Sequence, residues 1–151
     1  MRVLVQRSLD SSVSVSGKKV GKIDFGLVLL VGFTYGDTEK EIDYLINKII
    51  NLRIFDDENG VMNKSILDVK GSILSISQFT LYADTKKGHR PSYVKALKHG
   101  EASKLYDIFN DRLKKYVTVQ TGIFGSDMLV DIKNDGPVAI LLEREMGDGK
   151  K

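Results

Sequence analysis

The sequence predicts an α+β fold, in which two main amphipathic helices pack on an antiparallel or mixed, barrel-like β-sheet. The apolar patterns follow the order strands, helix, strands, helix, strands, without a strict alternation of single strands and helices. A GxGxxG motif is also absent, which argues against a Rossmann fold. The length of 151 residues predicts one domain over residues 1–151, with a sizeable core.

The N-terminal third is typical of a β-meander. Its apolar or alternating segments are separated by residues of turn composition. We expect strands within 1–15, at 20–23 and at 27–33.

A helix is predicted to follow this meander. Residues 38–41 form the sequence pattern of a capping box, which begins with Thr38 and ends with Glu41. Isoleucine and leucine then recur from Ile42 to Ile50 at the spacing of one helical face. The pattern predicts a one-sided helix that ends near Leu52.

The middle of the chain predicts a turn, a buried strand and a loop. The turn signal is Asn59-Gly60, which follows residues 53–55. Apolar residues dominate 72–81, which we interpret as one buried strand. Residues 84–91 are polar and basic, so we expect a loop there.

The C-terminal third predicts a second amphipathic helix, because apolar side chains recur at helical spacing over residues 102–116. Short apolar segments then predict the closing strands 117–120, 128–132 and 138–142. The polar, glycine-containing residues 143–151 predict a frayed tail.

Composition excludes several functions. The chain has no cysteine, so disulfides, thiolate catalysis and cysteine-ligated zinc are excluded. It has two histidines, and neither lies at a ligand spacing from an acidic residue, so we expect no metal and no other cofactor. The formal net charge of +3 permits nucleic-acid binding without demonstrating it.

The sequence also predicts a soluble protein of the cytoplasm with no membrane contact. Charges interrupt the apolar stretch of the first residues, which is unlike a signal peptide. The longest apolar run, residues 26–33, is far too short to span a bilayer.

Residues 77–81 (Ser-Gln-Phe-Thr-Leu) place two hydroxyls, an amide and an aromatic ring at the end of an apolar run. One interpretation is an ordinary half-buried strand whose polar residues face solvent. Another is a strand end that offers main-chain N–H groups and hydroxyls to a reacting carbonyl. A hydroxyl nucleophile also needs a base. His89 and His99 lie in lysine-rich stretches typical of solvated surface, so a Ser-His-Asp triad is disfavoured.

The pair Gly136-Pro137 contains one of the two prolines and precedes the predicted strand 138–142. An ordinary turn explains it. A cis bond would instead fix two neighbouring carbonyls in an orientation that can bind an ammonium group. Arg7 stands in an apolar segment, and a buried arginine needs hydrogen-bond acceptors. We expect carbonyl oxygens of the Gly136-Pro137 loop to be those acceptors.

Two further segments allow contact with a nucleic acid. Residues 86–93 are basic and end in Tyr93, which fits either a solvated loop or a phosphate-binding segment with a stacking ring. Phe124 is flanked by glycines, and it fits either a core aromatic or an exposed platform for a base. The glycines favour the platform, because they permit close backbone approach.

Together these segments resemble the D-aminoacyl-tRNA deacylases, also called the D-tyrosyl-tRNA deacylase family. The two signature motifs of the family correspond to residues 77–81 and to residues 134–138 (Asn-Asp-Gly-Pro-Val). Supporting segments follow in order along nearly the whole chain, at residues 6–7, 53–55, 60–63, 87–92 and 121–128.

The resemblance implies a homodimer with active sites at the subunit interface. Such enzymes hydrolyse the ester between a D-amino acid and the terminal adenosine of tRNA. Their Gly-Pro bond is cis and reaches into the partner's pocket, where main-chain carbonyls hold the α-amino group. That role falls here to Gly136 and Pro137. An L-amino acid would drive its side chain into this wall, whereas glycine would escape rejection.

The resemblance also implies roles within the pocket. The catalytic residues would be Ser77, Gln78, Phe79 and Thr80. Phe124 and Met128 would bind substrate, with Phe124 against the adenine. Thr80 is a nucleophile in one view of the family. In the other, the ribose 2′-hydroxyl does the main work and the N–H groups of Phe79 and Thr80 bind the oxyanion, which the missing base favours.

One position departs from the family pattern. Ala139 stands where the family usually has threonine, so a hydroxyl that could support the Gly-Pro loop is missing. The alternative from another functional class is a non-catalytic tRNA- or RNA-binding module that uses the basic loop and the aromatic residues. A peptide-acting serine hydrolase is a third alternative.

Overall fold

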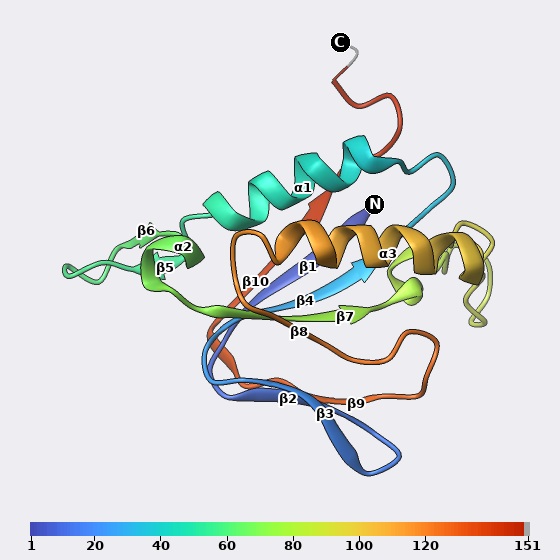
Figure 1. Ribbon diagram of the computed structural model, residues 1–151. Helices are drawn as coiled ribbons and strands as arrows, with labels where there is room; N and C mark the ends of the chain where they lie inside the picture. The colour runs from blue at the N-terminus through green and yellow to red at the C-terminus, as the bar shows by residue number, and fades with distance from the viewer. Residues whose placement is uncertain (150–151) are drawn as a thin grey trace.

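The structure is a computed structural model that describes residues 1–149. Within these residues, a central five-stranded sheet carries two long helices on one face and a three-stranded sheet against the other (Figure 1). This mixed architecture confirms the α+β class. The predicted barrel-like closure is wrong for residues 1–149, because the sheets are open.

The central sheet mixes both strand directions. Its strands, in spatial order, are β10 (Asn134–Glu143), β1 (Arg2–Ser8), β4 (Gly26–Gly32), β7 (Ser72–Ser77) and β8 (Val119–Thr121). Strand β1 is antiparallel to both neighbours, whereas β4, β7 and β8 are parallel to one another. β4 and β7 read as nearly continuous apolar runs, because both faces of the sheet are covered there.

The smaller sheet consists of β3 (Lys18–Ile23), β2 (Ser11–Val15) and β9 (Leu129–Asp131). Val13 and Ile23 of this sheet pack on Val28, Leu74 and Ile76 of the central sheet. This second apolar cluster joins the two sheets face to face.

The two long helices are α1 (Glu39–Asn51) and α3 (His99–Leu113). Helix α1 begins at the predicted capping box, in which the main-chain N–H of Thr38 donates to the Glu41 carboxylate at 2.7 Å. Helix α3 begins three residues before the predicted start. Their apolar faces cover the sheet and form the main core with β1, β4 and β7.

The prediction of one strand over 72–81 is wrong at its C-terminal end. Strand β7 ends at Ser77, and Phe79–Tyr82 form the 3-10 helix η1. The N–H groups of Leu81 and Ala83 donate to the carbonyls of Gln78 and Thr80 in this turn. Apolar residues continue through both elements, so the pattern alone shows no boundary.

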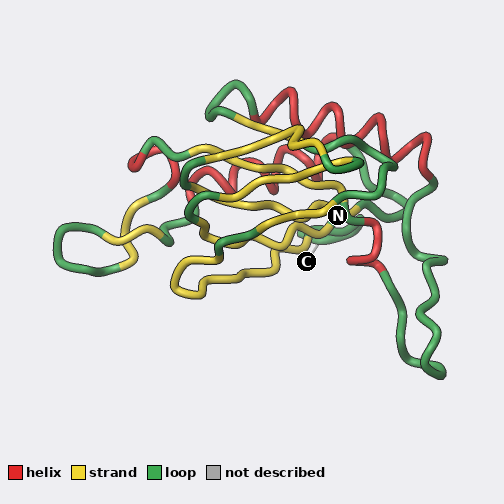
Figure 2. Tube along the Cα trace, turned by 90° about the horizontal axis from the view of Figure 1, so that it is seen from below, coloured by secondary structure: helices red, strands yellow, loops and turns green. Residues whose placement is uncertain are grey.

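Two short elements lie beyond α1. The turn at 59–60 joins β5 (Phe55–Asp56) to β6 (Met62–Lys64), and the one-turn helix α2 (Ile66–Val69) follows. Two projections stand out from the body in Figure 2: this hairpin at one end, and the long loop between η1 and α3 at the other.

The C-terminal segment is partly described. Residues 150–151 of the predicted frayed tail lie outside the described residues. Before them, Glu143 ends β10, Arg144 donates its main-chain N–H to Met1 O at 2.9 Å, and Glu145 donates to the Asp148 carboxylate at 2.8 Å. Among residues 1–149, no helix combines the length and apolarity needed to cross a membrane.

Candidate active site

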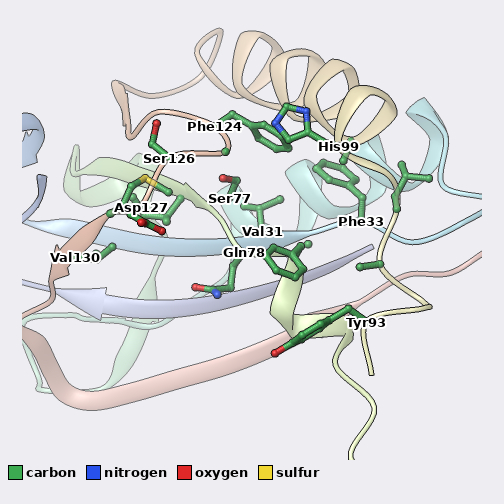
Figure 3. Close-up of a pocket in the computed structure, with 18 residues that line it drawn as sticks. Val31, Phe33, Ser77, Gln78, Tyr93, His99, Phe124, Ser126, Asp127 and Val130 are labelled. Carbon is green, nitrogen blue, oxygen red and sulfur yellow. The ribbon is translucent and has the colours of Figure 1, made fainter. Parts of the chain in front are cut away.

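A cavity of about 590 Å³ opens at the carboxyl ends of β4 and β7 (Figure 3). The start of α3 and the segment between β8 and β9 form its other walls. Apolar side chains line much of it, among them Val31, Phe33, Ile76 and Leu97. Its size is typical of sites that bind small molecules or parts of larger substrates.

Five of the predicted site residues meet at this cavity. Ser77 ends β7, Gln78 and Phe79 lead into η1, and Phe124 and Met128 precede β9. The structure therefore brings together two sequence motifs that lie more than forty positions apart. Figure 3 shows Ser77 near Phe124, toward the helix, and Gln78 lower, beside the sheet.

Two main-chain donors at the start of η1 lack partners. The first N–H groups of a helix have no acceptor within it. Within residues 1–149, the N–H groups of Phe79 and Thr80 donate no hydrogen bond, whereas the N–H of Gln78 donates to Val31 O at 2.7 Å. Phe79 lines the cavity. A pair of free adjacent donors is suited to an oxygen that gains negative charge.

The hydroxyl of Thr80 makes no hydrogen bond to a base within residues 1–149. It accepts a hydrogen bond from the amide of Gln78. In the described part of the chain, no imidazole or carboxylate is hydrogen-bonded to this hydroxyl, and Thr80 is not among the residues that line the cavity. Activation of Thr80 as a nucleophile would require such a base.

Phe124 is held by two other rings. Its centroid lies 5.6 Å from that of Tyr106 and 4.8 Å from that of His99, where the rings meet edge to face. Gly125 permits this arrangement, because its φ is +79° and a Cβ there would meet His99 Nε2 at 2.6 Å. Phe124 is thus both packed on the core and exposed to the cavity.

Tyr106 anchors this aromatic group from below. Its hydroxyl donates to the carbonyl of Ser75 at 2.8 Å, inside the core. Burial raises the pKa of Tyr106 against the opposing effect of its hydrogen bonds, so the phenol stays neutral and keeps its donor.

Sequence reasoning did not place three polar residues at the cavity. His99, Ser126 and Asp127 line it. The side chain of His99 is exposed, as expected of a lysine-rich stretch, but its ring faces the cavity because α3 begins above the end of β7. Ser126 and Asp127 lie in the segment 121–128 that supports the family resemblance, yet no local pattern shows which way they point.

Gly136 and Pro137 lie away from the cavity of their own chain. Their peptide bond is cis, and both residues are exposed. They precede Ala139, which pairs with Gln6, near the amino end of β4. The cavity begins at Val31 of β4, three residues beyond Val28, which is about 10 Å at the rise of a strand, and β1 separates β10 from β4. Neither Gly136 nor Pro137 lines it.

Arg7 supports this segment, but not in the predicted way. Its Nη1 donates to the carbonyl of Ile54 at 2.9 Å, and its Nε lies 3.2 Å from the Asp135 carboxylate. The acceptor is therefore in the segment before β5, and the expected bond to a Gly136 or Pro137 carbonyl is absent from residues 1–149. The guanidinium still touches the loop, since a Cβ on Gly136 would meet Nη2 at 3.0 Å.

Asn134 closes the loop from the other side. Its side-chain amide donates to the carbonyls of Arg7 at 2.9 Å and of Val138 at 3.0 Å. These two bonds join the start of β10 to its continuation after Pro137. They support the loop in a chain that has Ala139 in place of the hydroxyl residue.

No group of three or more histidine, aspartate or glutamate side chains within residues 1–149 is arranged to hold a metal ion. The polar side chains that line the cavity carry hydroxyl, amide, imidazole and carboxylate groups.

Comparison with known proteins gives matches over almost the full length. A family model described as D-Tyr-tRNA(Tyr) deacylase matches residues 4–143. A D-aminoacyl-tRNA deacylase of Bacillus cytotoxicus is 56% identical over 144 residues, which cover 95% of this chain and 99% of the relative. One of Bacillus cereus (strain AH187) is 55% identical with the same coverage.

Two solved structures share the fold. One described as c-Myc DNA Unwinding Element Binding Protein superposes with a TM-score of 0.91 and 39% identity, covering 95% of this chain and 99% of that one. Another, of a probable eukaryotic D-amino acid tRNA deacylase, gives 0.80 at 16% identity, covering 93% and 97%, and supports the fold alone. Fold and matches define a hydrolase. The chain belongs to the D-Tyr-tRNA(Tyr) deacylase family.

Proposed function

We propose that this protein hydrolyses the ester bond between a D-amino acid and the terminal adenosine of tRNA, releasing the free D-amino acid and tRNA. Glycine mischarged on tRNA is a substrate too, since it has no side chain to reject. The observation that carries the proposal is the free N–H of Phe79, a residue that lines the cavity, with the free N–H of Thr80 next to it in the chain. Family membership supplies the class of substrate.

In the proposed reaction, the N–H groups of Phe79 and Thr80 bind the oxyanion that forms when water adds to the ester carbonyl. One such donor contributes about 2.7–4 kcal/mol of transition-state stabilisation. The 2′-hydroxyl of the terminal ribose acts as a proton relay: it accepts a proton from the attacking water while it gives its own proton to the departing 3′-oxygen, so that the free amino acid and tRNA are released. The absence of a base beside Thr80 in residues 1–149 supports this division of labour.

Chiral selection is assigned to Gly136 and Pro137 of a second copy of the chain. Their carbonyls would hold the α-ammonium group in the partner's cavity, and the wall they form would reject an L side chain. Three observations support a role between subunits: the pair is exposed, it is braced by Arg7 and Asn134, and it does not line the cavity of its own chain.

The outer face of β10 supports a homodimer. Val138, Ile140 and Leu142 pack on the main core, so the alternate residues face away from it. Of these, Ala139 is exposed and Leu141 is 50% exposed, next to Leu4 of β1. A second copy that covers this apolar face would bring its own Gly136-Pro137 segment to the interface.

Phe124 is proposed to contact the adenine, and Met128 to line the substrate site beside it. The ring of Phe124 is fixed by Tyr106 and His99, which leaves a rigid surface for stacking.

The first test compares D-tyrosyl-tRNA, L-tyrosyl-tRNA and glycyl-tRNA by following loss of the ester. We expect hydrolysis of the D and glycyl esters and none of the L ester. Equal hydrolysis of both tyrosyl esters would refute the chiral wall. Tight binding without hydrolysis of any ester would favour the non-catalytic RNA-binding module. A D-tyrosyl-tRNA whose terminal ribose lacks the 2′-hydroxyl is expected to be stable.

The second test distinguishes a site between subunits from a site within one chain. Phe79→Pro removes one oxyanion donor, and Gly136→Ala alters the opposing segment. A mixed dimer with one variant in each copy is expected to contain one intact site and to recover about half of the wild-type activity, whereas either variant alone stays inactive. No recovery in the isolated mixed dimer would place all groups of the site in one chain.

A further inference from the structure

A basic loop beside the cavity is not used by the proposed reaction. Residues 84–95 belong to the long projection between η1 and α3 (Figure 2). Two main-chain hydrogen bonds between Asp84 and Ser92, at 2.8 and 2.9 Å, close its neck. The segment that leads from the loop to α3 is fixed by a hydrogen bond, in which Leu97 donates its N–H to Phe33 O at 3.0 Å. The loop is therefore anchored at both ends.

Positive charge is concentrated on this loop. Residues 84–95 carry four cations, Lys86, Lys87, Arg90 and Lys95, against one carboxylate, Asp84. This surplus equals the formal charge of +3 of the whole chain. Lys95 lies 3.5 Å from Asp84, but in the described part of the protein the other three cations make no ion pair.

Asp84 does not neutralise the tip. Its carboxylate accepts a hydrogen bond from the main-chain N–H of Lys86 at 3.0 Å, and this bond lowers the pKa of Asp84. The Asp84 carboxylate is thus hydrogen-bonded at the base of the loop. The side chains of Lys86, Lys87 and Arg90 are exposed. An isolated charged loop is normally just solvated, so its surroundings decide what it can bind.

Two aromatic rings connect the loop to the cavity. Tyr93 follows the neck, and its ring meets that of Phe79 edge to face at 5.2 Å. Both rings line the cavity, yet Tyr93 is 43% and Phe79 56% exposed. Exposed aromatic rings next to cations are typical of surfaces that bind single-stranded nucleic acid, because bases stack on the rings and phosphates pair with the cations.

The reach of the loop fits this use. Its tip lies four residues beyond the neck, which is at most about 13 Å for an extended chain. The cations are therefore adjacent to the mouth of the cavity but outside it, where they cannot take part in ester hydrolysis.

We propose that residues 84–95 bind the single-stranded nucleotides that precede the terminal adenosine of the substrate RNA. Lys86, Lys87 and Arg90 contact phosphates, and Tyr93 stacks with a base at the mouth of the cavity. The inference rests on the proposed function, since a terminal adenosine in the cavity places the preceding nucleotides at this loop. Recognition here depends on the backbone and not on which amino acid is attached.

The experiment compares Lys86→Ala/Lys87→Ala with Lys18→Ala/Lys19→Ala. Both pairs are adjacent exposed lysines, so the variants have the same net charge and differ in location. Two substrates are used: D-tyrosyl-tRNA and the D-tyrosyl ester of adenosine, which has no phosphate. We expect the loop variant to lose roughly tenfold in kcat/KM on the tRNA through KM, and nothing on the adenosine ester. The control variant should match wild type on both.

Salt dependence gives a second kinetic readout. Each phosphate contact with a single strand contributes about 0.7 to the slope of log affinity against log salt, so loss of two contacts should flatten the slope by about 1.4. An equal loss of kcat/KM on the tRNA in both variants would show that the effect comes from net charge and not from the loop, and it would overturn the proposal. A loss on the adenosine ester would show that the loop supports the cavity instead.

A binding measurement separates this inference from the proposed function. The probe is an RNA hairpin that carries no amino acid and has a single-stranded 3′ end. It is compared with the same hairpin without the single-stranded end. We expect wild type to prefer the hairpin with the free end, and the loop variant to lose that preference. Equal binding of both hairpins by wild type, or equal preference in the variant, overturns the proposal even if deacylation is observed. If wild type hydrolyses neither ester but shows a preference that the loop variant loses, the proposed function fails, and what is supported is binding of a single-stranded 3′ end by the loop.

Discussion

The side-chain amide of Gln78 donates a hydrogen bond to the hydroxyl of Thr80, at the point where β7 turns into η1. Gln78 lines the cavity and Thr80 does not. The hydroxyl therefore fixes the orientation of a neighbouring amide. This arrangement is what a positioning residue requires, and it differs from that of an activated nucleophile.

Thr80→Ala is accordingly expected to keep substantial activity. We expect kcat/KM on D-tyrosyl-tRNA to fall by about tenfold or less, because the cost is that of a loosened Gln78. Loss of a true nucleophile would cost on the order of 10⁴-fold or more. Thr80→Ser keeps the hydroxyl and serves as the control. A Thr80→Ala variant that folds and binds substrate but has no turnover would support covalent catalysis by Thr80 instead.

Phe79 offers a test of the main-chain donor itself. Phe79→Pro removes its N–H, and the first position of a helix tolerates proline. Phe79→Ala removes the same ring and keeps the donor. We expect Phe79→Pro to have a kcat about 100- to 1000-fold below that of Phe79→Ala, with similar thermal stability. Similar kcat values in the two variants would show that this N–H does not bind the oxyanion.

Gly136→Ala is expected to destabilise the protein by about 1–3 kcal/mol. The φ of Gly136 is +120°, and a Cβ there would meet Val138 Cγ2 at 2.8 Å and Arg7 Nη2 at 3.0 Å. Gly100→Ala, in α3, is the matched control, since nothing lies within 4 Å of its added Cβ. The control should be neutral or more stable by up to about 1 kcal/mol. Urea unfolding measures both, and a stable Gly136→Ala variant would contradict the packing around Arg7.

Because Asn134 supports the Gly-Pro loop, we expect stability to depend strongly on Asn134 and only weakly on residue 139. Asn134→Ala removes two hydrogen bonds to main-chain carbonyls and should cost about 1–3 kcal/mol. Ala139→Thr adds the hydroxyl usual in the family at an exposed site and should change the free energy of unfolding by about 0.5 kcal/mol or less. A large gain from Ala139→Thr would mean that the loop lacks support in this chain.

The environment of Glu41 predicts that part of the folding stability is lost at acid pH. Its burial raises its pKa, but the hydrogen bonds from the Thr38 hydroxyl and N–H outweigh this, so the pKa lies below its ordinary value of 4.5. The ionised carboxylate therefore stabilises the fold above the unfolded pKa, and this contribution is lost as pH falls through the lower folded pKa.

Glu41→Gln removes that titration. Urea unfolding of wild type and variant between about pH 6 and pH 3 should show a smaller loss of stability in the variant on acidification. Thr38→Ala should cost about 1 kcal/mol at neutral pH, as expected for an N-cap. Parallel pH profiles of wild type and Glu41→Gln would mean that the Thr38 bonds do not hold the carboxylate.

Local patterns were sufficient for the elements whose signals are local. The capping box from Thr38 to Glu41 and the apolar face that follows located α1 to within a residue of its ends. The prediction of a strand over 72–81 was wrong at its C-terminal end, because Phe79 and Leu81 continue the apolar pattern through η1. That turn is fixed by packing, since Leu81 closes over Gly32 of the neighbouring strand.

The cavity depends on contacts that no local pattern contains. Residues 77–79 and 124–128 are neighbours because β7 pairs with β8 in parallel, and this pairing follows from the whole sheet. His99 reaches the cavity because α3 starts above it. The acceptor of Arg7 was missed for a similar reason, since Ile54 is brought to the loop by the segment after α1.

The separation of Gly136-Pro137 from its own cavity has a consequence for dilution. Under the proposed arrangement, an isolated copy contains the cavity and the Gly136-Pro137 segment, but the two cannot form one site. Activity per chain should therefore decline steeply below the dissociation constant of the dimer, while circular dichroism remains that of a folded protein. The enzyme would lose turnover before it loses structure, and raising the protein concentration would restore it.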